Sequence, residues 1–189
     1  MGCNKSFKKK ILMKNSVIYL DIDGVLATDK QYSIKKTSKS YLSEFNCYPY
    51  DAKCVKIFND ILEETDAEII LSSDWSLYYT LKQMDEIFKI NGIIKSPYDI
   101  AHPKALRMSA SAALNRGFSI DEHLFFNQHE FGNYVIIDDL DITCYNNSWS
   151  QERTVDYDNF VHCSRGDFEG IKQSGIKEKI LKILNKREL

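Results

Sequence analysis

Four short runs of consecutive apolar residues predict strands that are buried on both faces. Such runs, rich in β-branched and aromatic residues, are typical of parallel strands with helices packed on either side. Three of the runs are clear and the last is weaker. In chain order they are Val17–Leu20, Ile69–Leu71, Tyr134–Ile137 and Phe160–Cys163.

Between these runs, apolar residues recur at intervals of three and four, which predicts amphipathic helices. The expected helices cover approximately residues 51–64, 77–90, 103–116 and 176–184. Asp51 is a suitable N-cap for the first helix, and Asn91–Gly92 supplies the end of the second. Pro103 suits the first turn of the third helix, which Gly117 is expected to end. Strands that alternate with helices indicate an α/β fold with a mainly parallel sheet.

Length and composition fit an ordinary single domain. The 189 residues can bury a substantial core without disulfide or metal staples, and the net charge of −2 gives no argument for a nucleic-acid or membrane partner. No apolar run approaches the roughly 20 residues that a membrane-spanning helix needs. The cysteines are odd in number and lack CxxC spacing, so we expect reduced thiols in a cytoplasmic protein. They are Cys3, Cys47, Cys54, Cys144 and Cys163.

Residues 1–12 form a distinct, basic start of the chain. We expect a disordered leader there, followed by a single domain over residues 13–189. An alternative stays open, because Met1–Ser6 fits the pattern for myristoylation at Gly2. Cys3 would then offer a palmitoylation site and Lys8–Lys10 a basic patch, and such combined signals are what stable membrane anchoring requires.

Polar residues follow the three clearest strands at their carboxyl ends, where ligands bind in open α/β sheets. These segments are Asp21-Ile22-Asp23-Gly24, Ser72-Ser73-Asp74 and Asp138-Asp139. One carboxylate can attack phosphorus, and a second carboxyl can protonate the leaving oxygen and later deprotonate a water. Gly24 permits a sharp turn directly after the pair Asp21 and Asp23.

Carboxylates repel a phosphate dianion unless a cation intervenes, and Mg²⁺ meets that need because it prefers oxygen ligands. Asp138 and Asp139 supply the further carboxylates, and the backbone carbonyl of Asp23 offers a neutral oxygen. A hydroxyl such as that of Ser72 and a cation such as Lys104 are suited to hold the phosphoryl oxygens.

The order of these segments resembles motifs one to four of the haloacid dehalogenase (HAD) superfamily, over roughly residues 16–163. The resemblance implies a three-layer Rossmann-like core and a phosphatase with Asp21 as the nucleophile and Asp23 as the general acid and base. It implies that the phosphate is held by Ser72, with Ser73 beside it, and by a cation of the third motif. The remaining assignments are Lys104 or Arg107 for that cation, and a magnesium site made by Asp21, Asp23, Asp138 and Asp139.

Within the superfamily, the segment Ser72–Trp75 looks most like the HAD domains of RNA-repair proteins, and the capless polynucleotide phosphatases are similar. In that pattern an Arg follows the Trp, whereas Ser76 stands there in this chain. We expect Trp75 to pack in the core, with stacking on a base as the alternative. Tyr and Lys side chains in the polar residues 27–50 are expected to form a solvated loop, although they also suit contact with a polyanion.

The leading hypothesis is therefore a magnesium-dependent phosphomonoester hydrolase acting on a phosphorylated substrate, such as a nucleic-acid terminus or a nucleotide. A cap domain needs about 50 residues or more, and the stretches 26–51 and 75–103 are too short for one, so we expect an open site. A small-molecule nucleotide phosphatase is the alternative. A non-catalytic binding module is disfavoured because it needs neither Asp21 nor Asp23. Stable membrane insertion is not expected, and the sequence does not predict the oligomeric state.

Overall fold

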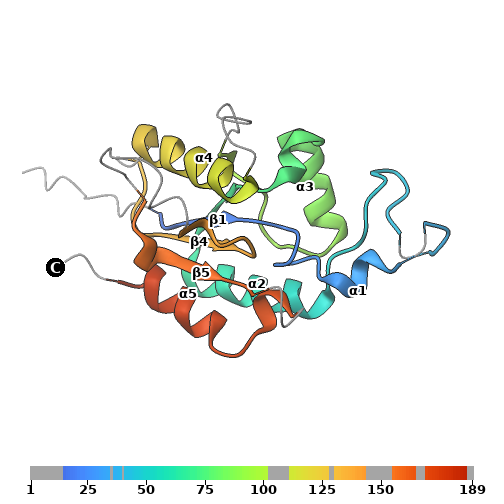
Figure 1. Ribbon diagram of the computed structural model, residues 1–189. Coiled ribbons are helices and arrows are strands. Elements are labelled where there is room, and N and C mark those ends of the chain that lie inside the picture. Colours follow the sequence, from blue (N-terminus) through green and yellow to red (C-terminus); the bar gives the residue numbers. More distant parts are fainter. Residues whose placement is uncertain are drawn as a thin grey trace, which may run out of the picture.

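Five strands run side by side in the same direction through the centre of the computed structural model (Figure 1). They are β1 (Val17–Leu20), β2 (Glu68–Leu71), β3 (Asp99–Ile100), β4 (Tyr134–Asp138) and β5 (Phe160–His162). Their order across the sheet is β3-β2-β1-β4-β5, with every pair parallel. The structure describes residues 15–34, 36–39, 41–101, 111–127, 130–143, 155–164 and 169–186.

The register of the sheet aligns the ends of its three central strands. Leu20, the last residue of β1, is paired with Leu71 of β2 on one side and Ile137 of β4 on the other. The backbone N–H of Asp21 continues the ladder by donating to the carbonyl of Ile137 at 3.0 Å. The polar residues that follow these strands therefore meet at one edge, on either side of the central strand.

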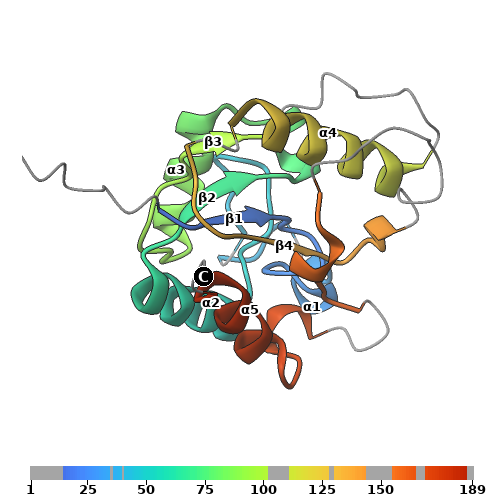
Figure 2. The same cartoon turned by 90° about the vertical axis from the view of Figure 1, so that its left-hand side faces the viewer.

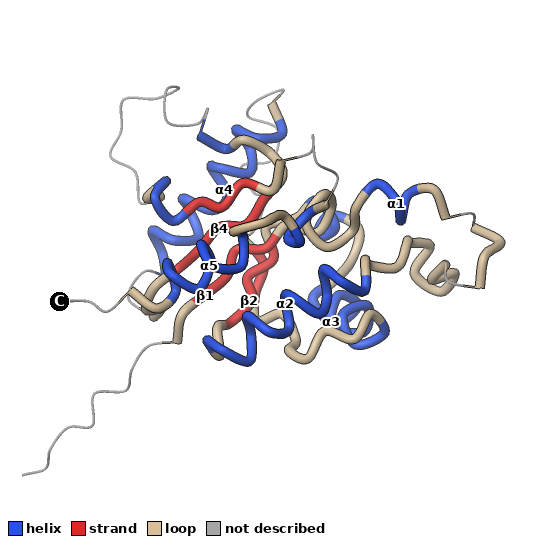
Figure 3. Tube along the Cα trace, turned by 90° about the horizontal axis from the view of Figure 1, so that it is seen from below, coloured by secondary structure: helices blue, strands red, loops and turns tan. Residues whose placement is uncertain are grey.

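Helices cover both faces of the sheet. The helix α4 (Ala112–Asn127) lies over one face, while α2 (Ala52–Thr65) and α5 (Ile176–Leu184) lie over the other (Figures 1 and 2). Seen from below, α2 and α5 run in front of the strands (Figure 3). The helix α3 (Leu81–Ile90) shares the core of α2 and α5 through buried apolar side chains.

Side chains along β1 alternate between the two cores that these helices close. Ile18 and Leu20 belong to the core under α2, α3 and α5, whereas Val17 and Tyr19 belong to the core under α4. All four are fully buried, as expected for a strand covered on both faces. The predicted α/β class, the three layers and the parallel sheet are confirmed.

Most of the predicted helix boundaries agree with the structure. Asp51 caps α2 by accepting from the N–H groups of Lys53 and Cys54 at 2.8 and 3.3 Å. Gly92, with φ of 82°, follows the end of α3, as predicted. Instead of beginning at Leu77, however, α3 begins at Leu81, because Thr80 caps it and Asp74–Leu77 form the separate 3-10 helix η1.

The prediction that Gly117 ends a helix is wrong. Gly117 lies inside α4 and is buried, and tertiary packing of the helix offsets the low helix propensity of glycine. Residues 102–110, most of the helix predicted over 103–116, lie outside the described residues. The strand β3 was not among the predicted strands, since two residues are too few to show a pattern.

The described residues of the stretch 27–50 form a loop that packs against α3 through Tyr50 and Phe88. The expectation of a solvated loop is wrong for Tyr41 and Tyr50, which are buried by tertiary packing. Among the described residues of this stretch, regular structure is limited to the four-residue helix α1 (Asp29–Tyr32) and an isolated bridge between Leu42 and Cys47. The Tyr79 hydroxyl donates to the carbonyl of Phe45 at 2.7 Å, which ties the loop to the start of α3. Among the described residues of the loop, Phe45, Cys47 and Tyr50 are buried in the core shared with α2, α3 and α5.

Two further expectations concern membranes and thiols. In the part of the chain that the structure describes, no helix is long and apolar enough to cross a bilayer. Cys47, Cys54 and Cys163 are buried and unbridged, as expected. The other two cysteines, and Gly2 with the rest of the first fourteen residues, lie outside the described residues.

The C-terminal turn η6 (Gly170–Lys172) supports the loop that follows β1. The N–H of Ile171 donates to the carbonyl of Val25 at 3.1 Å. Gly170 has φ of 58°, and a Cβ there would lie 2.3 Å from the Val25 carbonyl oxygen, so the contact requires glycine. Lys172 Nζ lies 2.6 Å from Asp51 Oδ2 and joins this turn to the start of α2.

Replacing Asp51 separates its two roles in stability. Asp51→Asn retains a side-chain acceptor for the helix but loses the charge that faces Lys172, whereas Asp51→Ala loses both. In urea unfolding at neutral pH, Asp51→Ala should be less stable than Asp51→Asn by about 1 kcal/mol. Equal losses would show that Asp51 does not act as a cap.

The ion pair between Asp51 and Lys172 predicts that the stability of the protein depends on pH. Burial favours the neutral acid, but the hydrogen bond and charge of Lys172 outweigh it and lower the pKa of Asp51. Because the pKa of Asp51 is lower in the folded state than in the unfolded state, where it is about 4, ionised Asp51 stabilises the folded protein above that pH. This stabilisation is lost as the pH falls through the folded-state pKa. The stability difference between wild type and Asp51→Asn should therefore shrink on acidification.

Candidate active site

A tight loop after β1 carries the two carboxylates of the first motif. The carbonyl of Ile22 accepts from the N–H groups of Val25, Leu26 and Ala27, and the N–H of Gly24 donates to the Ala27 carbonyl at 2.7 Å. Gly24 adopts φ of 77°, which glycine tolerates without strain. The turn leaves Asp21 buried at the strand end and Asp23 half-buried beside it.

Three buried carboxylates converge where β1 and β4 end. One oxygen each of Asp21, Asp138 and Asp139 can be chosen so that all three lie within 4.8 Å of one another. Carboxylate oxygens are the ligands that Mg²⁺ and similar hard cations prefer, and buried charges need compensation. These residues therefore fit a divalent cation. Asp23, the fourth predicted ligand, is not in this cluster.

Gly24 brings the backbone of the loop directly against Asp139. A Cβ at this position would lie only 2.1 Å from Asp139 Oδ2. No residue with a side chain can adopt this arrangement, so the glycine sets how closely the Asp139 carboxylate approaches the loop that carries Asp23.

Arg116 on α4 supplies a buried cation to this cluster, and the sequence analysis missed it. Its Nη1 lies 3.0 Å from Asp21 Oδ1 and 2.7 Å from Asp138 Oδ2, and its Nη2 lies 3.1 Å from Asp74 Oδ1. The side chain is 7% exposed. Arg116, Ile120 and Leu124 are spaced four residues apart and are all buried. A charge in line with an apolar stripe was the signal that could have found it.

The electrostatics of the cluster are dominated by burial and close charges. Burial alone would lower the pKa of Arg116, but the charges of Asp21, Asp138 and Asp74 raise it. Burial and the charge of Asp21 raise the pKa of Asp138 well above its usual value, although Arg116 opposes this. One guanidinium does not balance the carboxylates around it, which leaves room for further positive charge.

Lys104 and Arg107, the two predicted cations of the third motif, lie outside the described residues. In the part of the chain that the structure does describe, Arg116 is the residue whose positive charge contacts Asp21. Arg116, nine residues after Arg107 in the sequence, therefore lies next to the predicted nucleophile Asp21.

The two serines after β2 have different surroundings. Ser73 caps η1 by accepting from the N–H of Trp75 at 3.4 Å. Among the described residues, Ser72 Oγ is buried and has no hydrogen-bond partner, which costs free energy unless a ligand supplies one. Both serines line a small pocket of about 100 Å³ together with Arg116. A phosphoryl oxygen is an acceptor that would satisfy the Ser72 hydroxyl.

Asp23 is held by donors from two separate segments. The Tyr32 hydroxyl donates to Asp23 Oδ1 at 2.9 Å, and the Trp75 side chain donates a second hydrogen bond. Burial raises the pKa of Asp23, and the charge of Asp21 adds to this, while the two hydrogen bonds oppose it. A carboxyl with a raised pKa keeps its proton to higher pH, as an acid catalyst requires.

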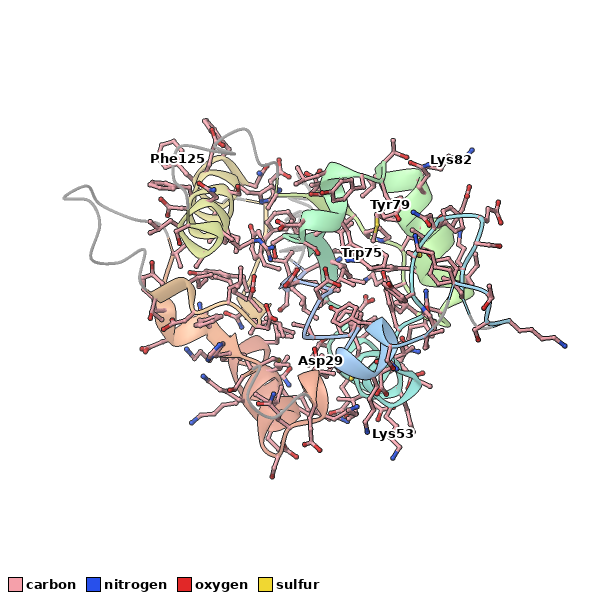
Figure 4. The ribbon with its side chains drawn as sticks, turned by 45° about the vertical axis from the view of Figure 1, so that its right-hand side comes forward. Asp29, Lys53, Trp75, Tyr79, Lys82 and Phe125 are labelled. Atoms are coloured by element: carbon pink, nitrogen blue, oxygen red, sulfur yellow. The ribbon has the colours of Figure 1, made fainter. Side chains whose placement is uncertain are left out.

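Trp75 is packed in the core, as predicted. It is 8% exposed and contacts Tyr50 and Tyr79 with ring centroids 5.5 and 5.6 Å away. Figure 4 shows Trp75 between the α3 side of the molecule and α1, which carries Asp29. A cleft of about 350 Å³ lies beside Asp23. Its lining consists of Asp23, Gly24, Thr28, Asp29, Tyr32, Asp139 and Ser164.

The all-parallel sheet and the acidic cluster at its carboxyl edge define an α/β protein with the Rossmann-like core of the HAD superfamily. Residues 17–168 match the family described as the HAD domain in Swiss Army Knife RNA repair proteins. The chain belongs to this family. HAD proteins generally use a divalent metal, and membership suggests a hydrolase of the phosphatase type. No curated protein and no solved structure shows a significant match to the chain.

Replacing Gly24 by alanine tests the approach of Asp139, and Gly92→Ala is the matched control. Both glycines have positive φ, but a Cβ on Gly92 would meet no atom within 4 Å. The backbone strain of each alanine costs about 1–2 kcal/mol. In urea unfolding, Gly24→Ala should lower the free energy of unfolding by clearly more than this amount, because it also displaces Asp139. Equal losses for the two variants would contradict the close approach.

Proposed function

We propose that this chain is a magnesium-dependent phosphomonoester hydrolase that works through a phosphorylated Asp21. The observation that carries the proposal is the position of Asp21, which is buried at the end of the central strand between a guanidinium and two further carboxylates. A side chain kept only for packing would not be surrounded by so many charges, because each buried charge costs free energy.

The chemistry follows from the residues around Asp21. A carboxylate oxygen of Asp21 attacks phosphorus, the bond from phosphorus to the leaving oxygen breaks, and Asp23 gives that oxygen a proton. A water then attacks the aspartyl-phosphate, Asp23 takes a proton from the water, and inorganic phosphate leaves. The hydrogen bonds from Tyr32 and Trp75 hold the Asp23 carboxyl in place for both proton transfers.

Arg116 and Ser72 are the residues suited to hold the phosphoryl group. Arg116 contacts Asp21 directly, so its charge is close to the place where a phosphoryl oxygen would lie during transfer. The buried Ser72 hydroxyl lines the same small pocket and donates to a phosphoryl oxygen.

Asp21, Asp138 and Asp139 are the residues suited to hold the Mg²⁺ ion. When bound, the ion neutralises the negative charge shared by the carboxylates and the phosphoryl oxygens. Asp138 already accepts from Arg116 and from the N–H of Leu140, at 2.7 and 2.9 Å. Asp138 therefore anchors Arg116 as well, and Asp139 is the stronger candidate for a direct ligand.

We further propose that the substrate is the phosphorylated end of an RNA strand. Two observations support this: the match to HAD domains of RNA repair proteins, and the small size of the loop inserted at residues 27–50. A site without a large cap admits a phosphate that is attached to a long chain. The second candidate is a phosphatase of mononucleotides, for which the same loop would serve as the cover.

Metal binding should stabilise the folded protein through Asp139. Addition of Mg²⁺ should raise the melting temperature of the wild type, because an ion that binds only the folded state stabilises it. Asp139→Asn should lose this rise, whereas Asp158→Asn, an exposed aspartate at the other edge of the sheet, should retain it. Hydrolysis should stop in chelator and return with Mg²⁺. Full activity in chelator, or zinc dependence, would refute the metal site.

Substrate choice should be measured on matched phosphate esters. We expect higher kcat/KM for 3′- or 5′-phosphorylated RNA oligonucleotides than for the corresponding mononucleotide. Asp21→Asn serves as the inactive control, since it removes the attacking charge at nearly constant volume and should abolish turnover. A clear preference for the mononucleotide would overturn RNA ends as the substrate but leave the hydrolase assignment intact. If Asp21→Asn retained activity within a few-fold of the wild type, the covalent mechanism would be overturned.

A further inference from the structure

The cleft beside Asp23 has the size of a small-molecule site and a lining made mostly of polar residues. Its volume of about 350 Å³ falls at the lower end of the range of about 300–1,000 Å³ that such sites occupy. Asp23, Asp29 and Asp139 all contribute to the lining, so the cleft disfavours a second anionic group. A group that enters it is therefore expected to be uncharged and able to donate hydrogen bonds.

Tyr32 gives this cleft one aromatic wall that is fixed in place. Its hydroxyl donates to Asp23 Oδ1 at 2.9 Å and lies 3.2 Å from the carbonyl oxygen of Ala27. Its ring packs edge to face with the ring of Tyr48, with centroids 5.8 Å apart. The residue nevertheless remains 38% exposed. A ring held in this way contacts a ligand at little cost in side-chain entropy.

The position of Tyr32 beside Asp23 places it next to the leaving group of the substrate. Asp23 protonates the oxygen that leaves phosphorus, so the group bonded to that oxygen must lie next to Asp23 during the reaction. Tyr32 touches Asp23 and lines the same cleft. The leaving group therefore meets the Tyr32 ring rather than the pocket of Ser72 and Arg116, which is suited to the phosphoryl oxygens.

We propose that this cleft binds the nucleoside that leaves the phosphate, and that its base stacks against the exposed part of the Tyr32 ring. The proposal rests on the proposed hydrolase function and names the part of the substrate that the site selects. Stacking on an aromatic ring accepts any base, because every base has a flat face. Asp29, whose exposed carboxylate lies on α1 at the cleft (Figure 4), is placed to accept from a ribose hydroxyl.

Two substitutions at Tyr32 isolate the ring from the hydroxyl. Tyr32→Phe and Tyr32→Leu both lose the hydrogen bond to Asp23, but only Tyr32→Leu loses the aromatic ring. Because α1 has no buried residue, both variants should fold, and their melting temperatures are measured beside that of the wild type as a control. Each variant is assayed on nucleoside 3′- and 5′-monophosphates and on glycerol phosphate, which has no ring to stack.

The expected result is a difference between the variants that depends on the leaving group. On the nucleotides, Tyr32→Leu should have about tenfold lower kcat/KM than Tyr32→Phe, carried mainly by KM. On glycerol phosphate the two variants should be equal. The same Leu-to-Phe ratio on both kinds of substrate would overturn the stacking proposal while the hydrolase function stands. Wild-type protein that hydrolyses no phosphomonoester would refute the hydrolase function, and the stacking proposal with it.

Discussion

The guanidinium of Arg116 is shared by carboxylates from three separate segments of the chain. Asp21 follows β1, Asp74 lies in η1 after β2, and Asp138 ends β4, and all three contact Arg116 within 3.1 Å. Arg116, Asp21 and Asp138 are buried, so each of their charges is costly unless another compensates it, whereas Asp74 is largely exposed. The ion pairs fix α4 over the carboxyl edge of the sheet. They also fix the position of the predicted nucleophile Asp21 relative to Arg116.

The order of the strands makes this shared contact possible. Because β1 lies between β2 and β4, the residues that follow these three strands are neighbours at one edge although they are far apart in sequence. Asp21 is therefore flanked by Ser72 on one side and Asp138 on the other. The loops then divide the edge into two regions. One is a small pocket with Ser72 and Arg116, and the other is the larger cleft with Asp23 and Tyr32.

Sequence patterns were sufficient where a local rule decides the structure. Buried strands, the cap at Asp51 and the acidic residues at the strand ends all follow from composition and spacing over a few residues. The contacts of Arg116 and Tyr32 do not, because they depend on tertiary packing between distant segments. Gly117 was misleading for the same reason: glycine ends many helices, but here it is a buried residue in the interior of α4. The roles of Lys104 and Arg107 stay predictions.

Identifying the residue that becomes phosphorylated tests the account most directly. Protein incubated briefly with a phosphate-labelled substrate and Mg²⁺ should be quenched in acid, digested and analysed by mass spectrometry. The account predicts a label on the peptide that contains Asp21, and its loss on treatment with hydroxylamine, which cleaves acyl phosphates. An acid-stable, hydroxylamine-resistant label on Ser72 or Ser73, or turnover with no labelled protein at any time, would contradict it.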